Sequence, residues 1–171
     1  WSARLWCTCL WGMTMTFDTA FDRLLGNEGR YCNVPGDPGG ETNWGISKRS
    51  YPNFDIARLT KEQAKTVFRR DFWDPLGDAD PAIKFQVFDF AVNSGIQTAI
   101  RKLQAAIEVA DDGHWGPISA AKLATCDRND VLMRYMAQRL RFWASLSTFP
   151  QFGKGWINRA AKQLEFASED N

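Results

Sequence analysis

The sequence has few of the residues that metal sites require. His114 is the single histidine among 171 residues, and the chain contains no pair of Cys-x-x-Cys units. A zinc site needs several such ligands at short spacing, so we do not expect a zinc peptidase or a zinc amidase. We therefore predict no metal and no organic cofactor.

Cysteine is also too sparse for a disulfide framework. Cys7 and Cys9 are too close in the chain to pair comfortably with each other. The other two cysteines, Cys32 and Cys126, are isolated. The fold must therefore depend on a hydrophobic core, for which 44% hydrophobic residues in 171 positions are sufficient.

A long apolar run is missing as well. The stretch from Leu5 to Trp11 is far shorter than the ~20 residues of a membrane-spanning helix, and no signal peptide with a cleavage site is recognisable. Residues 1–14 begin without methionine and follow neither helical nor strand periodicity. We interpret them as a non-native or disordered extension, and we expect residues 15–171 to form a single domain.

Acidic residues are scarce near the C-terminus, although the net charge of the whole chain is only +1. Between Arg128 and Lys162 there are seven basic residues and one acid, Asp130. Such basic helices could contact an anionic cell wall or outer membrane, or they could be a solvated helix face. We expect no nucleic acid partner and a monomer.

Apolar residues at helical spacing predict a mainly α protein. We expect helices over residues 17–28, 60–73, 82–93, 97–108, 117–124, 129–146 and 154–167. Thr60 and Gln63 form a capping box, and Asp80 is an N-cap before Pro81. The helix over 82–93 is apolar nearly all round, which predicts a place in the middle of the core.

The last two predicted helices have one apolar face each. The residues that this periodicity places inward are Leu132, Met133, Met136, Leu140, Trp143, Trp156, Ile157, Ala160, Ala161 and Leu164. No segment shows convincing strand alternation, and only a short hairpin within residues 31–46 is expected. The prediction is an α-helical bundle around a buried central helix, with an irregular glycine-rich loop.

That loop, residues 28–46, is the most distinctive stretch of the sequence. It contains five glycines and two prolines, and it holds Asp37 and Glu41 close to the run Thr42-Asn43-Trp44. Loops on a rigid scaffold usually carry the chemistry of a protein. Acids and aromatic residues with few basic residues suit a neutral polymer such as a sugar better than a phosphate.

Glu28 stands at the start of this loop and in an unusual position. It falls on the apolar stripe of Phe17, Phe21 and Leu24, and burial of a carboxylate raises its pKa. A carboxyl group that keeps its proton near neutrality is what general acid catalysis needs. The alternative is that Glu28 caps the helix or pairs with Arg30.

The motifs Glu28-Gly-Arg-Tyr31, Asp37-Pro-Gly-Gly-Glu-Thr42 and Asn43-Trp-Gly-Ile46 resemble the signature of glycoside hydrolase family 108. Members are phage-type endolysins and related muramidases with a lysozyme-like fold. The region from Val87 to Pro117 is similar to the one that usually follows, often labelled peptidoglycan-binding. Residues 15–86 would then be the catalytic half and residues 87–171 the helical half.

The resemblance implies hydrolysis of the β-1,4 bond between N-acetylmuramic acid and N-acetylglucosamine in peptidoglycan, with Glu28 as the catalytic acid. Glycoside hydrolysis commonly uses a second carboxylate, for which Asp37 is the first candidate and Glu41 the competitor. Thr42 would help to hold the water, and inversion is favoured. The residues that could line a sugar groove are Tyr31, Glu41, Asn43, Trp44, Trp73 and Asn93.

Two other functions remain open. One is a lytic transglycosylase, which needs only the acid and yields an anhydro-sugar. The other is a non-catalytic wall-binding module or secretion accessory. For an endolysin of this family, the resemblance implies accumulation in the host cytoplasm and action at the periplasmic wall after release through a holin.

Overall fold

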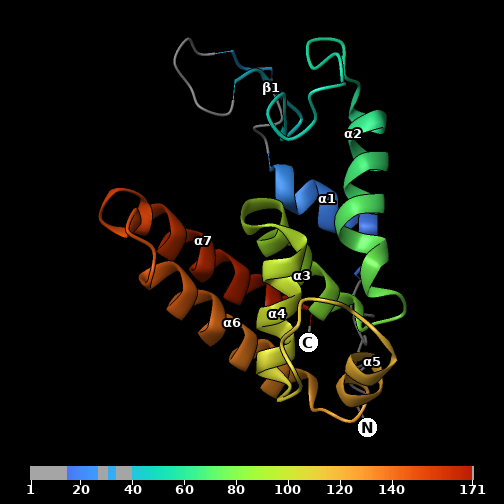
Figure 1. Ribbon diagram of the computed structural model, residues 1–171, viewed down its shortest axis with the longest axis vertical. Helices are drawn as coiled ribbons and strands as arrows, with labels where there is room; N and C mark the ends of the chain where they lie inside the picture. Colours follow the sequence, from blue (N-terminus) through green and yellow to red (C-terminus); the bar gives the residue numbers. More distant parts are fainter. Residues whose placement is uncertain (1–14, 27–30, 34–39, 171) are drawn as a thin grey trace, which may run out of the picture.

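The computed structural model describes residues 15–26, 31–33 and 40–170, and these ranges form a mainly helical protein with one small hairpin (Figure 1). The helices are α1 Phe17–Leu25, α2 Lys61–Phe68, α3 Pro81–Ser94, α4 Ile96–Ala106, α5 Pro117–Leu123, α6 Arg128–Ala144 and α7 Phe149–Glu169. Strands β1 Thr42–Asn43 and β2 Ile46–Ser47 pair antiparallel, and the turns η1 Arg69–Trp73 and η2 Asp74–Leu76 connect α2 to α3. The predicted fold class is confirmed. Within the described ranges, no helix is both long and apolar enough to cross a membrane.

Local capping signals fix the starts of two helices as expected. Thr60 accepts a hydrogen bond from the Gln63 amide, and the Gln63 side chain accepts one from the Thr60 amide, so both halves of the capping box are present. The Asp80 carboxylate accepts from the amides of Ala82 and Ile83. Helix α6 is capped by Asp127 and ends at Ala144, two residues before the predicted end at 146.

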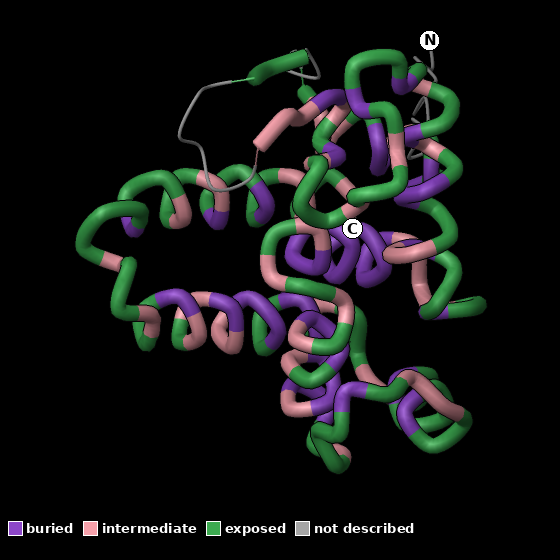
Figure 2. Tube along the Cα trace, turned by 45° about the horizontal axis from the view of Figure 1, so that its top comes forward, coloured by how far each residue is buried: buried purple, intermediate pink, exposed green. Residues whose placement is uncertain are grey.

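Helix α3 is the centre of the structure, as its sequence predicted. Residues 82–91 are all buried, including the polar ones, and Figure 2 shows this helix surrounded by the others. Phe85 and Phe88 face a cluster built from α1, α2 and the hairpin, whereas Val87 and Phe90 face a second cluster built from α4, α6 and α7. One helix therefore serves two hydrophobic clusters.

The two clusters are accompanied by a buried charged contact between three helices. Asp89 of α3 pairs with Arg139 of α6 at 2.7 Å and also with Arg159 of α7. The side chains of Asp89 and Arg139 are 1% and 0% exposed, so this pair is inside the protein. Arg139, one of the basic residues near the C-terminus, is thus part of the core.

This arrangement corrects the predicted inward faces of α6 and α7. Met133, Ile157 and Leu164 are exposed, at 66%, 47% and 47%. Arg139 and Gln163 occupy buried positions on the same helices instead. The physical reason on α6 is that Arg139 meets the buried Asp89. On α7 the backbone carbonyl of Gln163 accepts a hydrogen bond from the Gln86 side chain, which holds that face of the helix against α3.

Candidate active site

The hairpin closes the predicted active-site loop. The amides and carbonyls of Cys32 and Thr42 exchange two hydrogen bonds of 2.8 Å, so the ends of the segment 33–41 are held together. Asn43 then pairs with Ile46 across a two-residue turn. The chain on either side of the acidic stretch is therefore anchored to the same small sheet.

The structure describes neither the predicted acid nor its first candidate partner. Glu28 and Asp37 lie outside the described residues, as does the extension 1–14. Helix α1 ends at Leu25, three positions before Glu28. The amphipathic face of α1 packs Phe17 and Phe21 into the core. The roles assigned to Glu28 and Asp37 stay predictions.

Tyr31 and Glu41 face each other beside the closed loop. The Tyr31 hydroxyl donates a hydrogen bond of 2.9 Å to the Glu41 carboxylate. The acceptance of this bond by Glu41 raises the pKa of Tyr31, so the phenol stays protonated. Tyr31 is 49% exposed, so its ring is open to solvent.

Thr42 is half-buried, and its hydroxyl donates to the Gly40 carbonyl at 3.3 Å. This is a local turn contact of the kind that threonine makes in many loops. The hydroxyl oxygen keeps its capacity to accept a hydrogen bond. Thr42 therefore stabilises the turn and remains a candidate for holding a water.

Asn43 and Trp44 point into the protein. The Asn43 amide donates to the carbonyls of Ile56 and Leu59, and the Trp44 indole donates to the Leu59 carbonyl at 3.0 Å. Asn43 is 6% exposed. Both side-chain donors therefore attach the hairpin to the 56–59 segment, which leaves them little to offer a sugar.

The turn between the strands needs an unusual backbone. Trp44 and Gly45 have φ angles of +50° and +78°, as in the type I′ turns of tight hairpins. A Cβ on Gly45 would lie 3.3 Å from the ring of Phe68, so glycine also allows the turn to approach α2. For Trp44 the left-handed conformation is strained, and its bond to Leu59 offsets this cost.

Trp73 and Asn93, the other predicted groove residues, are held by contacts of their own. Trp73 is 7% exposed and packs edge-on against Phe17 and Phe88, with the Lys84 ammonium 4.7 Å from its ring centre. The described geometry thus favours the core role for Trp73. Asn93 is exposed in the last turn of α3 and donates to the backbone carbonyl of Asp89.

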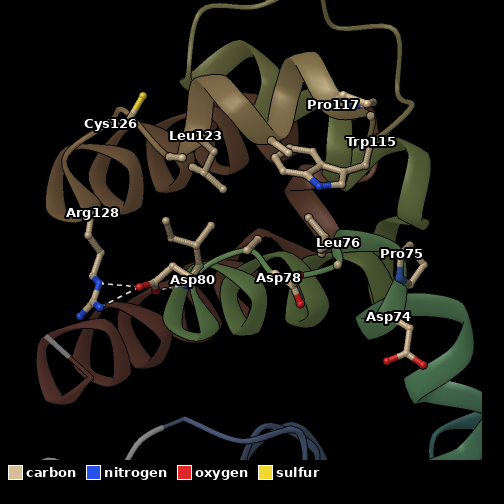
Figure 3. A pocket seen from close by; sticks show the side chains of 16 residues that line it. Asp74, Pro75, Leu76, Asp78, Asp80, Trp115, Pro117, Leu123, Cys126 and Arg128 are labelled. Atoms are coloured by element: carbon tan, nitrogen blue, oxygen red, sulfur yellow. Dashed lines mark hydrogen bonds and ion pairs between the residues drawn. The ribbon is translucent and has the colours of Figure 1, made fainter.

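The structure also contains a hollow that the sequence did not indicate. It measures about 730 Å³ and lies between η2 and α5, with Trp115 on one wall and Leu76 on the other (Figure 3). Asp80 and Arg128 form an ion pair of 2.7 Å at its edge. The strands and α5 lie at opposite ends of the molecule in Figures 1 and 2, so this hollow is separate from the predicted active-site loop.

No group of three or more potential metal ligands gathers within the described ranges. A helical bundle around a buried helix, with a small hairpin beside a loop rich in acids and glycine, defines a lysozyme-like class of protein.

Comparison with known families gives a match over part of the chain. The family model described as glycosyl hydrolase 108 matches residues 21–95, which include the end of α1, the loop, the hairpin, α2 and α3. Residues 21–95 are therefore similar to a glycoside hydrolase family. The proposed likeness of the following residues to a peptidoglycan-binding region stays a prediction.

Among solved structures, the chain is similar to SagA of Brucella abortus. The two are 27% identical, with a TM-score of 0.81, and the match covers 91% of this chain and 95% of SagA. The similarity thus includes the helices beyond residue 95. A comparison with curated protein sequences gives no significant match.

Proposed function

We propose that the protein is a peptidoglycan hydrolase of the muramidase type. Its reaction is hydrolysis of the β-1,4 bond between N-acetylmuramic acid and N-acetylglucosamine. The observation that carries the proposal is the family match over residues 21–95, because this range contains Glu28 and the complete acidic loop. The two carboxyl groups that glycoside hydrolysis normally uses are both available there.

Glu28 acts as the general acid in this proposal. It protonates the glycosidic oxygen of the leaving sugar, while a second carboxylate activates water or stabilises the cationic sugar. Asp37 is the preferred second carboxylate. The contact of Glu41 with Tyr31 supports this preference, because that hydrogen bond already occupies one oxygen of Glu41 and fixes its direction.

The sugar chain would lie over the exposed side of the hairpin. Tyr31 offers an open aromatic ring there, and Glu41 offers a carboxylate oxygen for a sugar hydroxyl. Asn43 and Trp44 support this surface from beneath by their bonds to residues 56 and 59. The site of action is the periplasmic wall, which an endolysin reaches from the host cytoplasm after holin-type release.

The proposal is tested with purified sacculi and mass analysis of the products. We expect the wild type to release muropeptides that have gained one water, and Glu28→Gln to lose activity by about 10²-fold or more. Asp37→Asn should lose more activity than Glu41→Gln. Glu62→Gln, an exposed position on α2, is the matched control and should behave as the wild type.

Three results would contradict parts of this proposal. Products that carry an anhydro-sugar would indicate a lytic transglycosylase. Binding to sacculi with no released fragments would indicate a wall-binding module. Full activity of Glu28→Gln would exclude Glu28 as the acid.

A further inference from the structure

The connection between α6 and α7 forms a tip with an unusual composition. Residues 142–153, which we call the α6–α7 tip, contain no charged side chain. No acid occurs anywhere between Asp130 and Glu165. The two antiparallel helices extend together to one side of the molecule, and the tip is their outer end (Figure 1).

Most of the positive charge of this region is neutralised within the protein. Five of its seven basic residues contact a carboxylate, namely Arg128, Arg134, Arg139, Arg159 and Lys162. The other two, Arg141 and Lys154, are exposed and have no carboxylate partner among the described residues. The uncompensated charge is therefore next to the tip and not spread along both helices.

The contact between the two helices indicates where these cations point. Trp143 of α6 stacks on Trp156 of α7 with 6.1 Å between the ring centres. Arg141 and Lys154 each stand two residues from one of these tryptophans, which is about 200° around a helix. Both cations thus point away from the helix contact, Arg141 on the outer side of α6 and Lys154 on the outer side of α7.

The same helical geometry gives their distance from the tip. Arg141 precedes the end of α6 at Ala144 by three residues, about 4.5 Å of helical rise, and Lys154 follows the start of α7 at Phe149 by five, about 7.5 Å. Long basic side chains can extend their charged ends further along such a surface. The cations therefore form a collar a short distance behind the apolar end.

The apolar end itself is incompletely buried. Phe152 is 48% exposed, and Leu146 and Phe149 are only partly covered. Phe149 and Phe152 both pack on Trp156, with ring centres 6.1 Å and 6.0 Å away, so the aromatic group is held in place. An ordered, uncharged aromatic end behind which two cations stand unpaired is suited to an interface between water, headgroups and acyl chains.

We propose that the α6–α7 tip binds the surface of membranes that contain anionic phospholipid. Leu146, Phe149 and Phe152 enter the boundary between headgroups and acyl chains, where interfacial segments sit about 5–10 Å deep. Arg141 and Lys154, ~4.5 Å and ~7.5 Å behind the ends of their helices, meet the lipid phosphates. This binding is independent of Glu28 and of the proposed hydrolysis.

Sedimentation with lipid vesicles tests the proposal. The full chain should bind vesicles of equal parts phosphatidylglycerol and phosphatidylcholine, and much less to phosphatidylcholine alone. Each basic residue near an anionic surface contributes ~1 kcal/mol, so Arg141→Gln with Lys154→Gln should lower the partition coefficient by about tenfold or more. Phe152→Ser should also lower it, by about fivefold or more.

Matched variants control for general effects. Arg58→Gln with Lys122→Gln removes the same charge from exposed positions elsewhere, and Ile118→Ala alters a side chain that is 80% exposed on α5. Both should bind as the wild type does, and circular dichroism checks that every variant is folded. Equal binding by the tip variants and the controls would overturn the proposal.

A soluble anionic polymer separates membrane binding from simple charge attraction. Polyphosphate is added to the vesicle assay and is also tested alone with each variant. If polyphosphate binds as tightly as the vesicles and Phe152→Ser has no effect on either, the tip is a site for anionic polymers and the membrane proposal is wrong. Binding to vesicles that depends on both Phe152 and the cations supports it.

Discussion

Arg139 and Asp89 form an ion pair with 2.7 Å between nitrogen and oxygen where neither side chain reaches solvent. The Arg139 guanidinium also lies 4.9 Å from the ring centres of Phe90 and Trp143. Arg159 donates hydrogen bonds to both oxygens of the same carboxylate. Asp89 is therefore the common partner of two cations from two different helices.

Removal of this carboxylate should be costly. We expect Asp89→Asn to lower the free energy of unfolding by about 3–5 kcal/mol, because Arg139 would stay buried without a counter-charge. Urea denaturation near neutral pH measures the effect. Glu108→Gln, which breaks an exposed pair with Arg134, should cost less than about 1 kcal/mol. Similar losses in both variants would show that burial of the pair is unimportant.

Asn43 tests whether the hairpin is held from within. Asn43→Ala removes two hydrogen bonds that a buried side chain donates to the Ile56 and Leu59 carbonyls, and each such bond contributes about 0.5–1.5 kcal/mol. We therefore expect a lower melting temperature, whereas Asn53→Ala at an exposed turn nearby should change little. If Asn43 instead binds sugar, its variant would raise KM for soluble wall fragments and leave stability unchanged.

Two glycines in α7 should respond in opposite directions. Gly155 has open space around the position of a Cβ, so Gly155→Ala should stabilise the protein by about 0.5–1 kcal/mol through helix propensity. A Cβ on Gly153 would lie 2.9 Å from the ring of Phe149, so Gly153→Ala should destabilise it. Thermal unfolding compares the pair, and a stabilised Gly153→Ala would mean that the Phe149 ring moves aside easily.

The environment of Asp71 predicts that the stability of the fold depends on pH. Its hydrogen bond from Arg70, followed by one from Tyr51, lowers the pKa of Asp71 below the ordinary value of 3.8. A lowered carboxyl pKa stabilises the fold above the unfolded value, and this contribution is lost as the pH falls through the folded value. Asp71→Asn should therefore be less stable than wild type near neutral pH, with the difference shrinking as the pH falls below about 4.

The control for that experiment is Asp111→Asn, an exposed position in the loop before α5. Urea unfolding at a series of pH values should give parallel curves for this variant and the wild type. A constant difference between Asp71→Asn and the wild type at every pH would contradict the assignment.

Features that depend on neighbouring residues were predictable from the sequence. The capping box at Thr60 and the cap at Asp80 involve contacts within three residues, and both are present. The burial of α3 was evident because apolar residues surround the helix. The motifs between Glu28 and Ile46 likewise indicated the family whose model matches residues 21–95, since their residues follow one another closely.

Features that depend on distant partners were not predictable. Ile157 and Leu164 were expected inside because hydrophobicity alone ranks them above Gln163, whose backbone carbonyl meets the Gln86 side chain of another helix. The inward direction of Asn43 and Trp44 follows from carbonyls more than ten residues away. The hollow beside Trp115 requires η2 and α5 to meet, which no local pattern reveals.

Because α3 packs against two hydrophobic clusters, the protein should not tolerate truncation after this helix. A fragment that ends at residue 95 would retain the whole family match and the acidic loop. It would also expose Val87, Phe90 and Ala91, which in the intact chain are 0%, 0% and 1% accessible. Such a fragment would expose a large apolar patch and aggregate. Activity assays on the isolated N-terminal portion would therefore measure the aggregate and not the folded enzyme.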